Sequence, residues 1–349
     1  MAEITCPHCG HRTRLIPLTP GAGRGLKLPA LEAPTGLTLA DVSATAADLI
    51  ANVEKVIVGK REAVVLTVAT LLAEGHLLLE DVPGVAKTML ARALAVSAGC
   101  TFKRIQCTPD LQPSDVLGQP VLDPKTGRTE FSFGPLFAQL VLVDEINRAS
   151  PRTQAAMLEA MGERTVTDGR ITYDLERPFM VLATQNPIEQ QGTYQLPEAQ
   201  LDRFLIRLSL GYPAPADEKR MCERFQLRHP IETLTPVTAA DRITQCQAAV
   251  RAVPIPEAVT DAVLQLVLAT RRHAALLLGA SPRGSLGLLR MAQALAVIRG
   301  QTQVTLDLVR ELAPFVITHR LLPQRHLPPT TAAAAMAEIL GGPIAAPAA

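Results

Sequence analysis

The sequence predicts an α/β fold in which a parallel sheet flanked by helices is followed by an all-α domain. Apolar runs at residues 76–79, 140–143 and 179–183 have the length and the Leu/Val content of strands buried on both faces of a sheet. Each run ends in polar residues, at the place where open α/β sheets carry their ligand sites. From residue 217 to residue 327 the apolar residues follow a helical spacing instead. The chain therefore divides into two domains of different class.

The first strand leads into a turn with the residues of a phosphate-binding loop. Residues 81–88 read Asp-Val-Pro-Gly-Val-Ala-Lys-Thr, and a helical pattern begins at Met89. A turn before a helix N-terminus directs backbone N–H groups and partial positive charge at an anion. We expect Lys87 to reach the β- and γ-phosphates of a nucleotide and the Thr88 hydroxyl to bind Mg²⁺.

This loop departs from the pattern G-x-x-x-x-G-K-[ST] at two positions. Asp81 stands where the first glycine belongs and Ala86 where the second belongs, whereas Gly84 remains between them. For this segment alone, a purely structural turn before a helix is the alternative. The residues predicted to contact the nucleotide here are Asp81, Val82, Pro83, Gly84, Val85, Ala86, Lys87, Thr88 and Met89.

The other two strands end in further candidate site residues. Asp144 and Glu145 follow the second strand; we expect Asp144 to hold Mg²⁺ through water and Glu145 to act as general base on the attacking water. Asn186 follows the third strand, where its amide would bond the γ-phosphate and the same water. Taken singly, these residues also suit a solvated strand end and an Asn-Pro turn. Their order behind the Lys-Thr loop favours a nucleotide site.

Four segments resemble the MoxR family of AAA+ ATPases in wording and in order. They are DVPGVAKT at 81–88, LVLVDEINRAS at 140–150, LATQNP at 182–187 and LPEAQLDRF at 196–204. The resemblance spans roughly residues 40–327, and an alanine in the place of Ala86 also occurs in that family. It implies an AAA+ P-loop ATPase core, with a parallel sheet flanked by helices, and a C-terminal all-α lid domain.

The resemblance also implies a role for each matching residue. An arginine finger of an AAA+ ring acts on the ATP of the neighbouring subunit, so the matching arginine would act outside its own chain. The matching residues are Lys87 and Thr88 (Walker A), Asp144 and Glu145 (Walker B), Asn186 (sensor 1), Arg203 (arginine finger), Arg283 (sensor 2), and Val58 and Gly59 (the segment that packs on adenine).

Both arginines have local interpretations as well. Arg203 would project from a helix end, where a guanidinium can bind phosphoryl oxygens in bidentate fashion; a surface ion pair with Asp202 or Glu198 is the alternative. Arg283 lies two residues after Ser281, a predicted N-cap, and therefore in a first helical turn. A cation there opposes the helix dipole, and a nucleotide phosphate would compensate it. An exposed arginine tolerates the same position at small cost.

Composition predicts a soluble, cytoplasmic enzyme. The net charge of +1 gives no electrostatic reason to bind nucleic acid or a membrane surface. No apolar run approaches the roughly 20 residues of a membrane span, and the polar N-terminus does not resemble a signal peptide. The six cysteines are scattered, which indicates reduced thiols instead of a disulfide framework.

The N-terminal segment Cys-Pro-His-Cys-Gly-His, residues 6–11, has the pattern of a zinc-ribbon knuckle. Such a knuckle supplies two thiolates, here Cys6 and Cys9, whereas a structural zinc site needs four ligands. No second Cys-x-x-Cys follows in the chain. A zinc ion shared by two subunits and a site that no longer binds metal are the two alternatives.

These patterns predict five segments along the chain. Within the core we expect two hairpins, at residues 112–135 and 163–175, the second of which has Asp168-Gly169 between β-branched residues. In the wider AAA+ clade that this family resembles, such hairpins face a central pore and contact substrate. The segments are a Cys/His segment (1–12), a flexible linker (13–38), the ATPase core (39–212), the helical lid (213–327) and a disordered tail (328–349).

The expected function is Mg²⁺-dependent ATP hydrolysis by a ring-forming, hexameric enzyme that remodels or matures a partner protein. The resemblance implies that this partner is a client protein or a protein with a von Willebrand factor A domain. A nucleic-acid remodelling motor is one alternative, which the near-neutral charge disfavours. A non-hydrolysing, ATP-gated scaffold is another, because the loop is irregular at Asp81 and Ala86.

Overall fold

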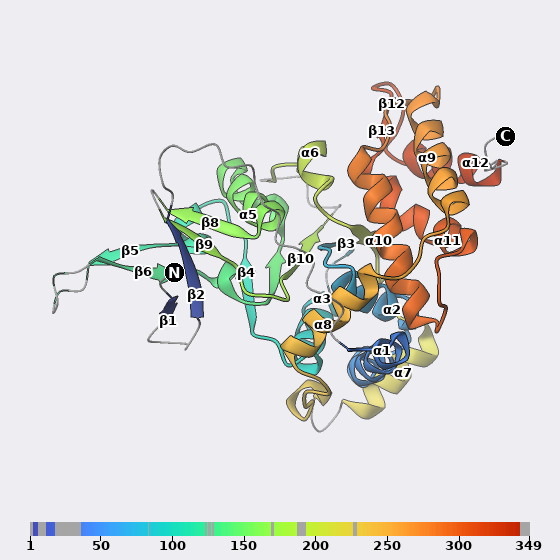
Figure 1. The fold of residues 1–349 in the computed structure, drawn as a ribbon. Helices are drawn as coiled ribbons and strands as arrows, with labels where there is room; N and C mark the ends of the chain where they lie inside the picture. The colour runs from blue at the N-terminus through green and yellow to red at the C-terminus, as the bar shows by residue number, and fades with distance from the viewer. Residues whose placement is uncertain are drawn as a thin grey trace.

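A computed structural model of the chain shows an α/β core beside a bundle of helices (Figure 1). Residues 3–5 and 12–17 are described as backbone alone. The structure describes residues 3–5, 12–17, 36–82, 84–122, 124, 127, 129–168, 171–186, 193–225 and 229–342.

The core is built on five parallel strands. They are β3 (Leu77–Glu80), β4 (Phe102–Gln106), β7 (Leu140–Asp144), β10 (Met180–Gln185) and β11 (Ile206–Leu208). Their order in the sheet is β11-β3-β10-β7-β4, so the three strands expected from the apolar runs are adjacent at its centre. Because the strands are parallel, the polar residues at their carboxyl ends meet at one edge. The predicted fold class is confirmed.

Both faces of this sheet are covered. Leu142 of β7 packs into one hydrophobic cluster, and the next residue, Val143, packs into the other, as the two-residue period of a strand requires. This double burial explains why the central strands are apolar at nearly every position. The helices of the core are α1 (Leu39–Glu54), α2 (Arg61–Leu72), α3 (Lys87–Ser97), α4 (Pro113–Leu117), α5 (Pro151–Glu163) and α6 (Glu198–Leu201), and α7 (Pro215–Arg224) follows them at the start of the predicted lid segment.

The lid domain is helical, as predicted. Its helices share the hydrophobic cluster that α1 and α2 form on one face of the sheet. Short 3₁₀ turns occur at η1 (Pro135–Phe137), η2 (Ile146–Arg148), η3 (Pro230–Glu232) and η4 (Thr318–Arg320). The lid contains α8 (Ala240–Arg251), α9 (Glu257–Arg272), α10 (Pro282–Ile298), α11 (Leu306–Ile317) and α12 (Thr331–Gly341), with a small sheet of β12 (Leu276–Leu278) and β13 (Leu322–Pro323).

The structure corrects the prediction of a disordered tail over 328–349. Helix α12 lies within that segment and packs against α9 and α11. Its buried residues are Ala332, Ala335 and Met336, at the i, i+3, i+4 spacing of one helix face. Alanine is the strongest helix former, so an Ala-rich segment with an apolar stripe forms a helix where a partner surface exists. Residues 343–349 lie outside the described residues.

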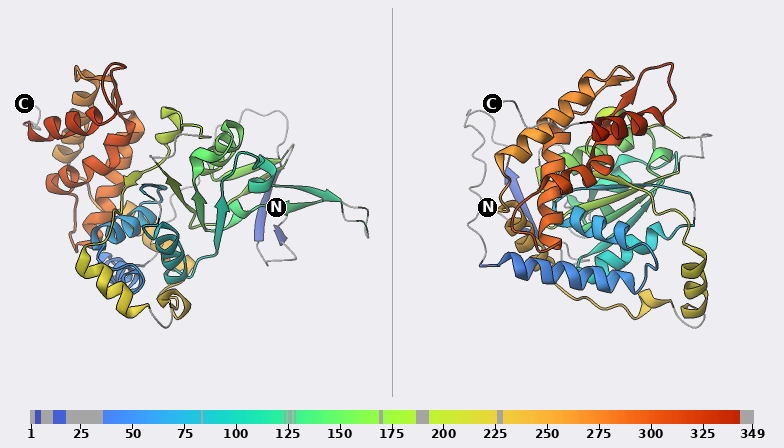
Figure 2. Two further views of the ribbon diagram at one scale, coloured as in Figure 1. Left: turned by 180° about the vertical axis from the view of Figure 1, so that it is seen from behind. Right: turned by 90° about the vertical axis from the view of Figure 1, so that its right-hand side faces the viewer.

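Both predicted hairpins are present. One consists of β5 (Gly118–Leu122) and β6 (Thr129–Phe133), and the other of β8 (Thr165–Asp168) and β9 (Ile171–Asp174). The β5–β6 hairpin extends from the core on the side opposite to the lid, in Figure 1 and in the reverse view of Figure 2.

The N-terminal strands correct part of the predicted linker. The strands are β1 (Glu3–Thr5) and β2 (Arg12–Pro17), and they extend the β8–β9 hairpin into a sheet of order β1-β2-β9-β8. Residues 12–17 therefore pair with β9 because that strand offers the unpaired backbone groups of a sheet edge. The rest of the predicted linker up to residue 35 lies outside the described residues.

Candidate nucleotide site

The loop after β3 has the geometry of a phosphate-binding turn. Gly84 has a φ of 86° and Ala86 a φ of 63°, which are left-handed conformations that bring the chain back into the start of α3. Apart from Gly84 and its two chain neighbours, no described residue has an atom within 4 Å of the place where a Cβ of Gly84 would stand, so the backbone is open to approach there. The Lys87 ammonium lies inside the turn and donates to the carbonyls of Asp81 (2.8 Å) and Val82 (3.3 Å).

The Asp81 side chain has a structural role in this loop. Its carboxylate is buried, and one oxygen accepts the backbone N–H groups of Leu210 (2.5 Å) and Gly211 (2.7 Å) together with the Ser209 hydroxyl (3.2 Å). The other oxygen accepts the N–H of Val82 (2.9 Å). These contacts tie the loop to the chain after β11, and the contact of Asp81 with a nucleotide stays a prediction. An aspartate at the position of the first glycine supplies the carboxylate that forms these hydrogen bonds, which a glycine could not form.

Thr184, which the motifs did not indicate, holds both acidic residues of the site. Its hydroxyl donates to one carboxylate oxygen of Asp144 (2.6 Å) and accepts the backbone N–H of Glu145 (2.8 Å). The register could have revealed it, because Ala183 of β10 pairs with Val143 of β7 and the next residues are therefore neighbours. Thr184 is buried, so this arrangement is fixed by the sheet.

The two carboxylates also have polar neighbours on their outer side. Arg104 of β4 donates to the second oxygen of Asp144 (2.6 Å). One oxygen of Glu145 accepts from Arg148 (2.9 Å) and from Gln106 (3.1 Å). Glu145 itself has a φ of 56°, an uncommon conformation for a non-glycine residue that is frequent at functional sites. The turn directs its side chain out of the strand.

These side chains meet in a pocket of about 340 Å³ at the carboxyl edge of the sheet. Val58, Gly59, Asp81, Val82 and Val85 were predicted to contact the nucleotide but do not line it. Pro83 lies outside the described residues. The lining residues are Gly84, Ala86, Lys87, Thr88, Met89, Asp144, Glu145, Thr184 and Asn186.

The donors and acceptors in this pocket fit a magnesium nucleotide. Backbone N–H groups at the start of α3 and the Lys87 ammonium suit phosphates. The Thr88 hydroxyl and the Asp144 carboxylate are the hard oxygen ligands that Mg²⁺ takes together with phosphate and water. Asn186 is buried at the same edge and supplies an amide.

The zinc prediction has no support. Cys6 and Cys9 lie outside the described residues. Within the described part of the chain, no group of three or more His, Cys, Asp or Glu side chains could hold a metal ion. The four cysteines that the structure describes are free thiols. Burial raises the pKa of the Cys100 and Cys107 thiols to about 12, so neither is reactive.

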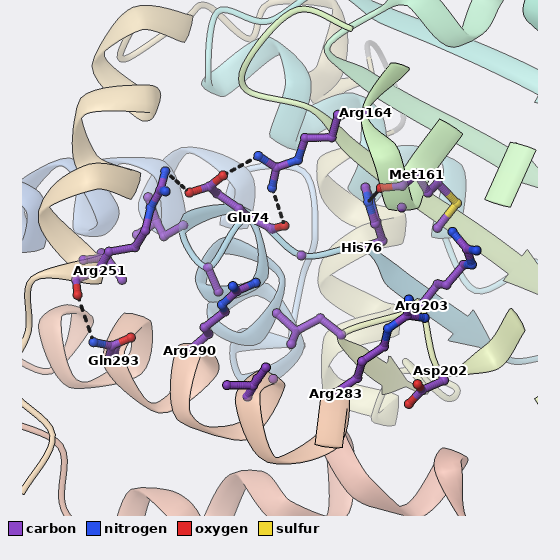
Figure 3. A pocket seen from close by; sticks show the side chains of 18 of the residues that line it. Glu74, His76, Met161, Arg164, Asp202, Arg203, Arg251, Arg283, Arg290 and Gln293 are labelled. Carbon is purple, nitrogen blue, oxygen red and sulfur yellow. Dashed lines mark hydrogen bonds and ion pairs between the residues drawn. The ribbon is translucent and has the colours of Figure 1, made fainter. Parts of the chain in front are cut away.

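Arg203 and Arg283 lie in a different pocket, of about 610 Å³, between the core and the lid (Figure 3). We call it the arginine pocket; it shares no lining residue with the nucleotide pocket. Its charged lining consists of Arg164, Arg203, Arg251, Arg283, Arg290, Arg320, Glu74 and Asp202.

The contacts in the arginine pocket leave part of its positive charge uncompensated. Glu74 forms ion pairs with both Arg164 (2.6 Å) and Arg251. Arg203 donates to the backbone carbonyl of Leu158 (2.7 Å) within α5. Neither Arg283 nor Arg290 has a carboxylate partner among the described residues. The ion pair of Arg203 with Asp202 or Glu198, which was the alternative from the sequence, is likewise not found in the described structure.

Among the described residues, no helix combines the length and the apolar character that crossing a membrane requires.

Two family models match the chain in the order of its domains. The AAA model, "ATPase family associated with various cellular activities", matches residues 76–206, and the AAA lid domain model matches residues 268–339. The second match includes most of α12, which agrees with the corrected tail.

Several known proteins are similar over most of the chain. Uncharacterized protein YeaC of Bacillus subtilis is 49% identical over 78% of this chain and 85% of its own length. Chaperone MoxR1 of Mycobacterium tuberculosis is 41% identical over 84% of this chain and 80% of its own. The crystal structure of a putative ATPase from Cytophaga hutchinsonii, 33% identical, superposes with a TM-score of 0.78 over 85% of this chain and 94% of that one. This degree of likeness, carried by core and lid alike, means that the chain belongs to the MoxR family of AAA+ ATPases.

Proposed function

We propose that the protein is a Mg²⁺-dependent ATPase whose active site is completed between two subunits of a ring. The observation that carries this proposal is the separation of the two pockets. Lys87, Asp144 and Glu145 line one, whereas Arg203 and Arg283 line the other. Membership of the AAA+ family supports an oligomer, and we expect a hexamer.

Each subunit would contribute two sets of groups. In its own pocket, Lys87 and the turn around Gly84 bind the phosphates, and Asn186 orients the attacking water. Glu145 accepts the proton of that water as general base. Bound Mg²⁺ would be held by Thr88 and Asp144 and would offset the charge of the phosphates. From its other face the subunit would present Arg203 and Arg283 to the phosphates of the neighbour, as cations that stabilise the charge of the transition state.

The work done by hydrolysis is proposed to be the remodelling or maturation of a partner protein. The relative named Chaperone MoxR1 supports a client protein, and a partner with a von Willebrand factor A domain remains an expectation from the family. At the end of β5, Val121 and Leu122 are 46% and 62% exposed, and such exposed apolar side chains support protein contact over nucleic-acid contact. A strand that binds nucleic acid would present cations instead.

The test is the ATPase rate per subunit as a function of protein concentration, for the wild type and for Glu145→Gln. We expect the rate per subunit to rise with concentration as rings form and to fall by about 10²–10⁴ in Glu145→Gln, because a general base is lost. Glu311→Gln, which changes a carboxylate on the lid, is the matched control and should behave as wild type. Bound ATP without turnover at any concentration would favour the gated scaffold.

A further inference from the structure

Asp202, the residue directly before Arg203, is held by two separate segments of the lid. Its carboxylate oxygens lie 3.0 and 2.9 Å from the Ser281 hydroxyl. Arg320 donates to one of the same oxygens at 2.6 Å. The Arg320 side chain is 3% exposed and the Asp202 side chain 15%, so the contact is shielded from water.

The backbone around Arg203 is fixed by the lid in addition. Arg320 donates to the carbonyl of Asp202 (3.2 Å) and to that of Phe204 (2.6 Å), which lie on either side of Arg203. The buried His319 ring lies 3.1 Å from the Phe204 carbonyl through Nε2. The chain direction at Arg203 therefore depends on residues more than a hundred positions later.

The same carboxylate reaches the start of the helix that carries Arg283. The Ser281 hydroxyl is the N-cap of α10 and accepts the backbone N–H of Arg283 at 3.1 Å. Asp202 therefore connects, through one hydroxyl group, the segment of Arg203 with the first turn of α10. Only Asp202 and Ser281 lie between the two cations along this route.

We infer that Asp202, together with Ser281 and Arg320, is a positioning residue that sets Arg203 and Arg283 as one unit toward the nucleotide of the neighbouring subunit. This inference rests on the proposed function, in which both cations act across the ring. Stability alone does not account for the arrangement, since a buried ion pair is often no more stabilising than an apolar pair of the same volume. The place of Asp202 in the structure accounts for it, because Asp202 is the chain neighbour of Arg203 and contacts the N-cap of the helix that carries Arg283. A lid that moves would then move both cations together.

The experiment combines subunits in mixed rings. Asp202→Asn subunits have an intact nucleotide pocket, and Glu145→Gln subunits have an intact arginine pocket. We expect Asp202→Asn rings to lose about 10²-fold in kcat, because a misplacement near 1 Å has that effect, with unchanged affinity for labelled ATP. Mixing them with Glu145→Gln subunits should restore part of the rate, as it should for Arg203→Ala. Glu311→Gln, which removes the carboxylate of another lid ion pair, should keep the wild-type rate.

Ser281→Ala covers the case in which Asp202→Asn does not fold. It keeps the Asp202–Arg320 ion pair and removes only the hydroxyl link, so a loss of several-fold in kcat that mixing restores is expected. The inference is overturned if Arg203→Ala recovers in mixed rings while folded Asp202→Asn or Ser281→Ala subunits either keep the wild-type rate or show no recovery. If Arg203→Ala also fails to recover, the proposed action across subunits is wrong, and the two failures are distinguished.

Discussion

The nucleotide pocket and the arginine pocket are built in opposite ways. The first is lined by two carboxylates and one ammonium, which neighbouring strands of a single sheet bring together. The second is lined by six arginines and two carboxylates, which come from the core and from the lid. Hydrogen bonds such as Arg320 to the Phe204 carbonyl join residues far apart in the sequence there.

This difference separates two tasks that phosphoryl transfer requires. In the proposed function, binding the phosphates and activating water needs Lys87 and Glu145 near one another, and adjacent strands provide that within one chain. Stabilising the charge that develops needs further cations, which the separate arginine pocket would supply to the nucleotide of a second subunit. Turnover would then depend on assembly, whereas binding would not.

The largest expected effect is on kcat and on ATP binding when one residue of each pocket is substituted in turn. Arg203→Ala should lower kcat by about 10³–10⁵, as loss of an arginine finger does, and leave the Kd for ATP unchanged. Lys87→Ala should weaken ATP binding first. Binding has to be followed with a labelled nucleotide, because the chain has no tryptophan. If Arg203→Ala weakened binding as much as Lys87→Ala does, both residues would serve one pocket and the contrast would be lost.

His76, which lines the arginine pocket, is the subject of the second prediction. Its ring lines the arginine pocket, lies 3.1 Å from the Met161 carbonyl through Nε2 and accepts the N–H of Val181 in β10 at 3.0 Å. Burial, and then the charge of Arg164, lower the pKa of His76 to about 4. The folded protein therefore keeps this ring neutral under conditions in which the unfolded chain protonates it.

The consequence is a loss of stability in acid. Between pH 6.5 and about pH 4 the unfolded state binds a proton at His76 that the folded state does not, so the free energy of unfolding should fall by about 3 kcal/mol as the pH decreases. Above pH 6.5 the His76 ring is neutral in both the folded and the unfolded state, so it causes no loss of stability there. Urea unfolding at pH 7 and pH 4.5 measures it, with His76→Gln for comparison. A pH dependence of equal size in His76→Gln would assign the effect to other groups, of which His319 is one.

Thr184→Val tests how the nucleotide pocket is held. The variant removes a hydrogen bond to the Asp144 carboxylate, which is worth about 1.5–3 kcal/mol, so kcat should fall by roughly 10- to 100-fold. Thr184→Ser keeps the hydroxyl and should retain most of the rate. Measuring the Mg²⁺ dependence of both variants shows whether Asp144 has been displaced. Equal rates for valine and serine would mean that the sheet alone positions the acids.

The two pockets also differ in how much of them the sequence reveals. The strand–loop–helix order around Lys87 and the strand ends at Asp144 and Asn186 predicted most of the nucleotide pocket, because these residues are local to elements with a clear period. The anchoring contacts of Asp81 and the role of Thr184 were missed, since they depend on partners in or just after other strands. The pattern G-x-x-x-x-G-K-[ST] cannot indicate that an aspartate binds the backbone after β11.

The sequence predicted Arg203 and Arg283 as separate functional residues, but not the pocket in which they meet. A family resemblance assigned roles to Arg203 and Arg283, but nothing local to either of them indicates Asp202, Ser281 and Arg320 as their common support. That support forms when the lid docks on the core. The helix at 331–341 was missed for the same reason, because its Ala-rich sequence becomes a helix through packing against α9 and α11.

The smallest expected effect concerns the loop itself. Ala86 has a φ of 63°, a conformation that costs a non-glycine residue about 1–2 kcal/mol, while glycine adds about 0.4–1 kcal/mol of unfolded-state entropy. Ala86→Gly should therefore stabilise the protein by up to about 1 kcal/mol in thermal unfolding. Ala91→Gly, at a buried position inside the helix α3 that Ala86 precedes, should destabilise it by about 1 kcal/mol or more. If Ala86→Gly were as destabilising as Ala91→Gly, packing of the Ala86 methyl group would stabilise the protein by more than the left-handed backbone conformation costs. Alanine would then be more stabilising than glycine at this position of the loop.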